Sequence, residues 1–328
     1  MRHALRETRP RAAPFSPIPP SFWDAAAKAW GHEADRTSGS HQFTYFEADL
    51  FISSVVRPNF RVLEIGCGTG SSTFVHAPEV RLLVGTDVSR GMLRQAGRRA
   101  KRTPGGTRVR FARVDAGRLP FKDSVFDAVI GRGVALSFVE SPAETLREIR
   151  RVLRPGGIVA VDAMNAASSG VRAGRSPRKH RLLRRIGGKP VYIEQFDEGD
   201  RQVRKVYFLH PKSDLAEAAR ETHSLTRRPK DLARQVVRTE RMNATYFSER
   251  TLRRMAGRAG LLEVRIHPLG QLHQLLSTDD SEMKRFVLRN RRLLSKLAVQ
   301  LGGRVTADGG PHLMLIASRP HRPSVQRR

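Results

Sequence analysis

The sequence predicts a doubly wound α/β fold, in which a mostly parallel sheet carries helices on both of its faces. The first observation is an apolar run at residues 62–65 that ends in the glycine-rich stretch of residues 66–70. The second is a series of further short apolar runs, which follow at residues 82–87, 109–115 and 125–130. The third is a helical pattern from residue 144 that ends in Arg-Pro-Gly-Gly, before another apolar run at residues 158–162. This alternation is typical of a parallel sheet with crossover helices.

Two helices are expected before the first strand. Residues 21–34 read as a helix that Ser21 caps, with Asp24 three positions later as in a capping box. The aromatic side chains of this segment would pack on the sheet or at the mouth of a ligand site; they are Phe22, Trp23 and Trp30. Residues 45–56 form a second amphipathic helix, which begins at Tyr45 and leads into the first strand.

The glycine-rich loop after the first strand predicts a ligand site. Glycine has no side chain, so a loop with Gly66, Gly68 and Gly70 brings backbone N–H groups directly against a ligand. If a helix follows the loop, its N-terminus adds a partial positive charge. The dinucleotide fingerprint Gly-x-Gly-x-x-Gly fails because its sixth position is Ser71, and a Walker loop would need a lysine. The carboxylate of Glu64 at the strand end suits a cationic amino group better than a pyrophosphate.

Acidic residues end the next two strands. Asp87 follows the glycine loop by about 20 residues, the distance at which an acid can accept hydrogen bonds from ribose hydroxyls. Asp115 ends the run that starts at residue 109. Taken alone, an acid such as Asp87 is more often a helix N-cap than a ligand, and one such as Asp115 is more often a turn residue. The glycine loop alone could equally be an ordinary tight turn. Their joint order and spacing favour a nucleoside-binding domain.

After residue 165 the chain departs from this pattern. Residues 166–190, rich in Gly, Ser, Arg and Pro, predict a mobile loop, and residues 191–210 predict a β-hairpin around Asp-Glu-Gly-Asp. Residues 213–240 are expected to be helical. Ligands of doubly wound sheets bind over the carboxyl ends of the strands. The insertion is therefore interpreted as a lid that recognises a substrate.

The C-terminal part is expected to complete the sheet. A helix that starts after Ser248 and stops at Gly260 precedes a strand at residues 261–269. Residues 279–301 have a helical apolar period that would serve core packing or a homodimer interface. A last strand occupies residues 311–318. The expected organisation starts with a disordered basic arm (residues 1–20), followed by N-terminal helices with the cofactor-binding core (21–165). The lid (166–241), the completion of the core (242–318) and a basic tail (319–328) follow.

These residues together resemble the class I S-adenosylmethionine-dependent methyltransferases. The quoted features are Glu-x-Gly-x-Gly-x-Gly from Glu64, the two later acids, Leu-Pro-Phe after Asp115 and Arg-Val-Leu-Arg-Pro-Gly-Gly at residues 151–157. The last two features resemble the small-molecule branch, which includes ubiquinone/menaquinone-type and methyltransferase type 11-like proteins. The resemblance covers residues 55–165 and resumes at 246–269 and 312–318. It implies a Rossmann-like methyltransferase sheet of seven strands, the last one antiparallel.

The resemblance also implies S-adenosyl-L-methionine as the cofactor. In the family, an acid at the position of Asp115 and the next backbone amide read the adenine edge. The residues carried over as cofactor-binding are Glu64, Gly66, Cys67, Gly68, Gly70, Asp87, Val88, Asp115, Ala116 and Gly131. Cys67 would pack or face the ligand rather than act as a nucleophile, and no His, Cys and Asp cluster has metal-ligand spacing.

The expected reaction is in-line transfer of a methyl group to an O, N or C atom of a small molecule. Positioning can supply much of its catalysis, so no strong base is required. Gly-Arg-Gly-Val at residues 131–134 disfavours methylation of adenine or glutamine nitrogens, and pyrimidine C5 methylation would need a cysteine outside the cofactor loop. Candidate catalytic groups are Tyr45, His210 and His223, with His267 and His273 as further histidines, and for each a packing or surface role is the competing interpretation.

The charge allows several interpretations. The chain has 60 Lys and Arg against 31 Asp and Glu, which gives +29 and a pI near 11.6. A general arginine bias, a polyanion partner and an anionic small substrate all fit, and only residues 172–189 form a dense basic cluster. Nonspecific nucleic-acid binding is expected in any case. The alternatives to a small-molecule enzyme are an RNA methyltransferase and a non-catalytic binding protein of the same fold.

The remaining composition sets the expected compartment. No apolar run approaches the ~20 residues that span a bilayer, and the first residues lack the apolar segment of a secretory signal. The single cysteine excludes an intramolecular disulfide. A cytoplasmic protein with a small-molecule acceptor, without a transmembrane segment, is therefore expected.

Overall fold

The computed structural model describes residues 20–24, 27, 40–168, 180–186, 189–198, 201–209, 236–270 and 310–321. Among these residues, no helix combines the length and the hydropathy that a membrane span requires. The rest of the expected N-terminal arm, most of residues 25–39, the helix at residues 279–301 and most of the tail lie outside the described residues.

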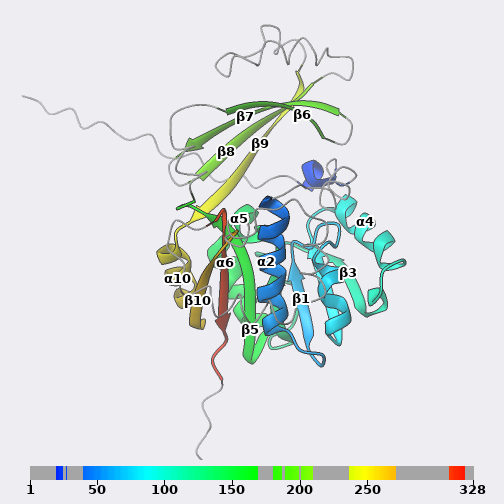
Figure 1. The fold of residues 1–328 in the computed structure, drawn as a ribbon, viewed down its shortest axis with the longest axis vertical. Coiled ribbons are helices and arrows are strands. Elements are labelled where there is room, and N and C mark those ends of the chain that lie inside the picture. Colours follow the sequence, from blue (N-terminus) through cyan, green and yellow to red (C-terminus); the bar gives the residue numbers. More distant parts are fainter. Residues whose placement is uncertain are drawn as a thin grey trace, which may run out of the picture.

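A central sheet of seven strands forms the core (Figure 1). Five strands are parallel: β1 (Arg61–Ile65), β2 (Leu82–Asp87), β3 (Val109–Arg113), β4 (Phe126–Gly131) and β5 (Leu153–Asn165). β11 (His312–Ser318) runs antiparallel between β5 and β10 (Leu262–Leu269). The order β3-β2-β1-β4-β5-β11-β10 confirms the predicted doubly wound sheet with an antiparallel last strand.

Helices bury apolar side chains against both faces of this sheet. The helices are α2 (Ser40–Val55), α3 (Thr73–His76), α4 (Arg90–Ala100), α5 (Ala135–Phe138), α6 (Pro142–Val152) and α10 (Glu249–Arg258). One apolar cluster contains residues of α6 and α10, and a second contains Phe51, Ile52 and Val55 of α2. The serine side chains that precede α4, α6 and α10 each accept a hydrogen bond from the first turn, as N-caps do.

Most strand ends agree with the sequence prediction, and three local features do not. β3 ends at Arg113, so Asp115 lies in the loop two residues beyond the strand. α2 begins at Ser40, five residues before the expected start. The helix after the glycine loop, α3, has only four residues and continues as a 3₁₀ turn at Ala77–Glu79, so it supplies little of the expected helix dipole.

The expected capping box near the N-terminus is wrong. Residues 20–24 are helical, so Ser21 lies inside the segment rather than before it. Asp24 does not serve its own helix: its carboxylate accepts hydrogen bonds from Ser89 and Gly91, at the start of α4. Asp24 therefore contacts the N-terminus of a distant helix, rather than that of its own helix as its distance from Ser21 suggested.

The described strands of the insertion after β5 form an antiparallel meander, where the sequence predicted a loop, a β-hairpin and a helix. Its strands are β6 (His180–Ile186), β7 (Lys189–Glu198), β8 (Arg201–Leu209) and β9 (Val236–Phe247). The β7–β8 pairing confirms the predicted hairpin. The loop expected at residues 166–190 is wrong where β6 forms, because β6 pairs with β7. The helix expected at residues 213–240 is wrong from Val236 onward, because β9 pairs with β8 there. The rest of the expected helix lies outside the described residues.

β9 joins the insertion to the core. It pairs with β5 at Met164↔Tyr246 and Asn165↔Phe247, which places the meander over the carboxyl end of β5 (Figure 1). β9 spans the expected boundary between residues 241 and 242, so that boundary falls inside a strand. Phe247, at the end of β9, is buried in the apolar cluster under α10.

Candidate functional site

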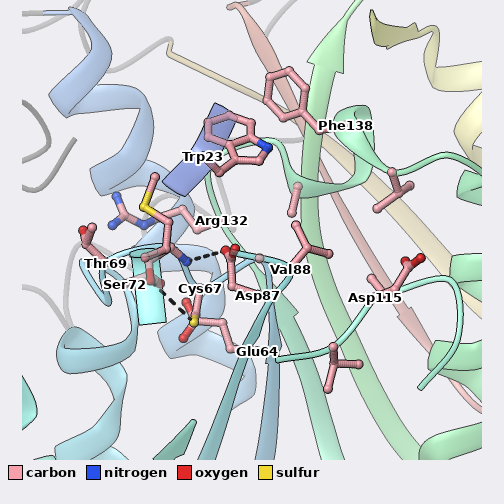
Figure 2. A pocket seen from close by; sticks show the side chains of 18 of the residues that line it. Trp23, Glu64, Cys67, Thr69, Ser72, Asp87, Val88, Asp115, Arg132 and Phe138 are labelled. Atoms are coloured by element: carbon pink, nitrogen blue, oxygen red, sulfur yellow. Dashed lines mark hydrogen bonds between the residues drawn. The ribbon is translucent and has the colours of Figure 1, made fainter. Parts of the chain in front are cut away.

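A cavity of about 310 Å³ lies at the carboxyl ends of β1, β2 and β4 (Figure 2). Its walls come from the glycine loop, from the loops after β2, β3 and β4, from Tyr45 of α2, and from Pro20 and Trp23. Eight of the ten residues expected to bind a cofactor line it: Glu64, Gly66, Cys67, Gly68, Asp87, Val88, Asp115 and Ala116. The sheet topology thus brings these eight residues together from three separate segments.

Gly70 and Gly131, the other two residues expected to bind a cofactor, do not line the cavity. A Cβ atom at Gly70 would lie 2.5 Å from the ring of Phe74. A Cβ atom at Gly131 would lie 2.9 Å from Ile65 and 3.3 Å from Val161. At both positions, neighbouring side chains therefore leave no room for a Cβ atom.

Gly68 lines the cavity and has an open Cβ position, as does Gly133 in the loop after β4. Its φ is +54°, which favours glycine, and a Cβ atom there would meet nothing within 4 Å. Since Gly68 also lines the cavity, a side chain at this position would enter it. The backbone N–H of Gly68 donates to Asp87 Oδ2 over 2.9 Å, which ties the glycine loop to the end of β2 (Figure 2).

Asp87 is fixed between two backbone amides. Its Oδ2 accepts the Gly68 bond, and its Oδ1 accepts from the Ser89 N–H over 2.9 Å. Burial raises the pKa of the carboxyl group, and the two hydrogen bonds oppose that rise. Each carboxylate oxygen has a second lone pair, so Asp87 can still accept hydrogen bonds from hydroxyl groups in the cavity.

Asp115 is both a turn residue and part of the cavity wall. Its Oδ1 accepts from the Gly117 N–H over 2.9 Å, which is an Asx-turn, and its side chain is exposed. Val88 and Ala116 add apolar surface on the same side of the cavity. The two interpretations of Asp115 left open by the sequence are therefore compatible.

Glu64 is almost fully buried at the base of the cavity, with 1% of its surface exposed. Its Oε2 accepts a hydrogen bond from Thr73 Oγ1 over 2.5 Å. Burial raises its pKa, against the lowering effects of Thr73, His76 and Arg132. A cationic group that entered here would favour the ionised carboxylate.

A buried charged cluster beside Glu64 is missing from the sequence prediction. Asp49 of α2 contacts His76 Nε2 at 3.1 Å, Ser72 Oγ at 3.2 Å and Arg132 Nε at 3.3 Å. Burial lowers the pKa of His76, but the hydrogen bonds to Asp49 and Glu79 outweigh it and raise the pKa overall. The sequence signal available was Arg132 alone, the first residue after β4.

Arg132 and Tyr45 also line the cavity. The Arg132 guanidinium carbon lies 5.0 Å from the centre of the Tyr45 ring, a cation–π contact. Burial and the charge of Asp162 raise the pKa of Tyr45, against the lowering effect of Arg132. Tyr45 is therefore a protonated phenol at neutral pH, which suits it to donate a hydrogen bond rather than to act as a base.

Of the other candidate catalytic groups, only His267 lies among the described residues. His210, His223 and His273 lie outside the described residues. His267 stacks on Phe51 at 4.7 Å between ring centres and does not line the cavity. Burial raises the pKa of Cys67 well above its usual value, so its thiol is protonated.

Asp162 at the end of β5 supports the loop that follows β4. Its carboxylate accepts from Val134 N–H at 2.7 Å and Gly133 N–H at 3.3 Å, and contacts His312 Nδ1 at 3.2 Å. Val134 has φ +60°, a strained conformation for a β-branched residue. We expect the Asp162 hydrogen bonds to hold this conformation, which sets Arg132 and α5 around the cavity. No motif in the sequence singles out Asp162.

No metal site accompanies the cavity in the described part of the chain. No group of three or more His, Cys, Asp and Glu side chains there is arranged to hold a metal ion.

Comparison with protein families identifies the domain that builds the cavity. The profile of a methyltransferase domain family matches residues 62–157, from β1 to the turn within β5. This segment contains the glycine loop and the strand ends with Asp87 and Asp115.

Curated relatives match the same part of the chain. A demethylmenaquinone methyltransferase of Symbiobacterium thermophilum is 37% identical over 137 residues, which cover 40% of this chain and 54% of the relative. A 2-phytyl-1,4-naphtoquinone methyltransferase of Synechococcus elongatus is 36% identical over 111 residues, which cover 33% of this chain and 47% of the relative. The chain thus spans about half the length of these relatives.

Solved structures share the fold over nearly the whole chain. The CcbJ methyltransferase from Streptomyces caelestis has a TM-score of 0.58 at 18% identity, covering 92% of this chain and 98% of its own. An S-adenosylmethionine-dependent methyltransferase from Clostridium acetobutylicum has a TM-score of 0.55 at 12% identity, covering 90% and 97%. At these identities the likeness concerns the fold alone.

Proposed function

We propose that this chain, whose residues 62–157 form a methyltransferase domain, transfers a methyl group from S-adenosyl-L-methionine to a small-molecule acceptor. The observation that carries the proposal is the open position at Gly68, flanked in one cavity by the carboxylates of Glu64, Asp87 and Asp115. These hydrogen-bond acceptors suit a ligand with an amino group, ribose hydroxyls and a purine.

In this proposal, each carboxylate of the cavity binds a different part of the methyl donor. Asp87 would accept the ribose hydroxyls, Asp115 with Val88 and Ala116 would hold the purine, and Glu64 would face the amino group. When bound, the donor supplies a methyl group on a sulfonium centre. The chain contributes alignment of the two substrates and exclusion of water, which can account for much of the rate of an in-line displacement.

The acceptor side is aromatic and apolar, with one cation. Trp23 and Phe138 contact edge to face at 5.7 Å and line the cavity together with Val139. Arg132 can stabilise negative charge that an acceptor oxygen carries, and the Tyr45 phenol can donate a hydrogen bond to it. These features support a flat, aromatic acceptor, the class that the naphthoquinone substrates in the relatives' names also belong to.

The test is transfer of a labelled methyl group into fractionated cell extract. We expect label in the organic-solvent fraction of small molecules, and in a demethylated naphthoquinol offered as a pure acceptor. Label confined to RNA, at one position and at about 200 mM salt, where nonspecific binding is weak, would favour the RNA methyltransferase instead. Absence of label from every fraction would favour a binding protein without catalysis.

A further inference from the structure

The short helical segment at residues 20–24 lies against the start of α4, at the mouth of the cavity (Figure 1). Pro20 and Trp23 of this segment line the cavity, although more than 35 residues separate them from the glycine loop. Phe22 is buried, with 4% of its surface exposed. The contacts that hold this segment in place therefore also hold Pro20 and Trp23 in the wall of the cavity.

Asp24 is the polar anchor of the segment. Its Oδ1 accepts hydrogen bonds from Ser89 Oγ and from the Gly91 backbone N–H, each over 2.6 Å. Ser89 is the N-cap of α4, and its Oγ accepts in turn from the Met92 N–H over 3.0 Å. A carboxylate at a helix N-terminus is also favoured by the helix dipole. The anchor thus joins the segment to the loop that begins at Asp87.

The fit between the segment and α4 requires a glycine at position 91. A Cβ atom at Gly91 would lie 2.9 Å from both the Cα and the carbonyl oxygen of Asp24. These are backbone atoms, so they could move away only if the segment moved with them. Gly97, in the same helix, differs in this respect, because a Cβ atom there would meet nothing within 4 Å.

Trp23 connects the segment to another part of the cavity wall through ring contacts. Its ring packs edge to face on Phe22 at 5.3 Å and on Phe138 of α5 at 5.7 Å. Figure 2 shows Trp23 and Phe138 together above the glycine loop and Asp87. A displaced segment would remove Trp23 from the wall and open the cavity at this side.

We propose that Asp24 is a positioning residue that docks residues 20–24 on α4 and so holds Trp23 in the part of the cavity wall that the donor and the acceptor would share. The proposal rests on the proposed function, because it takes the cavity to be the site of S-adenosylmethionine. In this proposal, the Asp24–Gly91 contact controls the dissociation rates of the methyl donor and of its product. A purely structural tether would alter stability without changing those rates.

The experiment measures the dissociation rate of S-adenosylhomocysteine by stopped-flow fluorescence of Trp23. The chain has two tryptophans, so a Trp30→Phe background leaves Trp23 as the reporter. Asp24→Ala removes both accepted hydrogen bonds, whereas Asp24→Asn keeps an oxygen that can accept them. Gly91→Ala introduces the clash with Asp24, and Gly97→Ala is its matched control in the same helix. Thermal melting of every variant accompanies the rates.

We expect Asp24→Ala and Gly91→Ala to speed dissociation about tenfold, with Asp24→Asn closer to the unaltered chain. Gly91→Ala should melt closer to the unaltered protein than Asp24→Ala does, because alanine favours the helix and offsets part of the lost contacts. Equally fast dissociation from the two variants would therefore not follow from a weaker fold. Gly97→Ala should leave the rate unchanged. The proposal is overturned if the unaltered protein binds the probe but Asp24→Ala and Gly91→Ala release it at the normal rate. If the unaltered protein binds no S-adenosylhomocysteine, both the proposed function and this proposal fail.

Discussion

Replacing Gly68 by valine is expected to abolish S-adenosylhomocysteine binding, by at least about 100-fold, in a protein that still folds. The Cβ position of Gly68 is open to the cavity, so the valine side chain would occupy the space of the ligand. The φ of +54° adds strain of roughly 1–2 kcal/mol for a residue with a side chain. That strain lowers stability modestly, whereas the filled cavity removes binding.

Isothermal calorimetry and thermal melting separate these two effects. Gly97→Val is the matched control, because its side chain would also enter open space but on α4, away from the cavity wall. We expect it to bind normally. Near-normal affinity in folded Gly68→Val would mean that the ligand does not occupy the space in front of the glycine loop.

Removal of the inserted meander is expected to separate cofactor binding from methyl transfer. The ends of the insertion are adjacent, because Asn165 pairs with Phe247 and the Ala166 N–H donates to the Phe247 carbonyl over 3.0 Å. A short Gly/Ser linker can therefore replace residues 169–243 and retain the end of β9, which packs in the core. S-adenosylhomocysteine affinity should stay within a few-fold, since the cavity wall comes from other segments.

Methyl transfer to the acceptor found by labelling should fall by about 100-fold or more, because an acceptor without its lid is poorly aligned. Melting and calorimetry on the shortened chain establish that the core and the donor site are intact. A shortened chain that methylates the acceptor at the normal rate would show that residues 166–241 are not an acceptor lid.

The sequence predicted those parts of the site that lie within one strand and the loop after it. Glu64, Gly68 and Asp87 each follow a recognisable apolar run, and parallel strands bring such ends to one edge of the sheet. The antiparallel last strand was implied by the resemblance to class I methyltransferases, and the structure confirms it. These features depend on local order along the chain, which the sequence displays directly.

The features that the sequence did not predict depend on contacts between distant segments. Asp49 and Arg132 meet across 83 positions, and Asp162 supports Val134 from the neighbouring strand. Asp24 suggested a local cap but binds residues 65 and 67 positions away. β9 was expected to be partly helical because its pairing with β8 could not be read from its own residues. Side-chain chemistry alone does not reveal such partners.

The most direct test of the account is a calorimetric titration of the intact chain with S-adenosylhomocysteine, with NADH as a competitor. We expect micromolar affinity, about −8 kcal/mol, and no competition by NADH. Asp87→Ala should weaken binding by ~1–3 kcal/mol through the loss of hydrogen bonds to a charged group. Asp123→Ala removes an exposed acid that is not part of the cavity wall and should bind normally. Unchanged affinity in Asp87→Ala, or displacement of the ligand by NADH, would contradict the assignment of this cavity to S-adenosylmethionine.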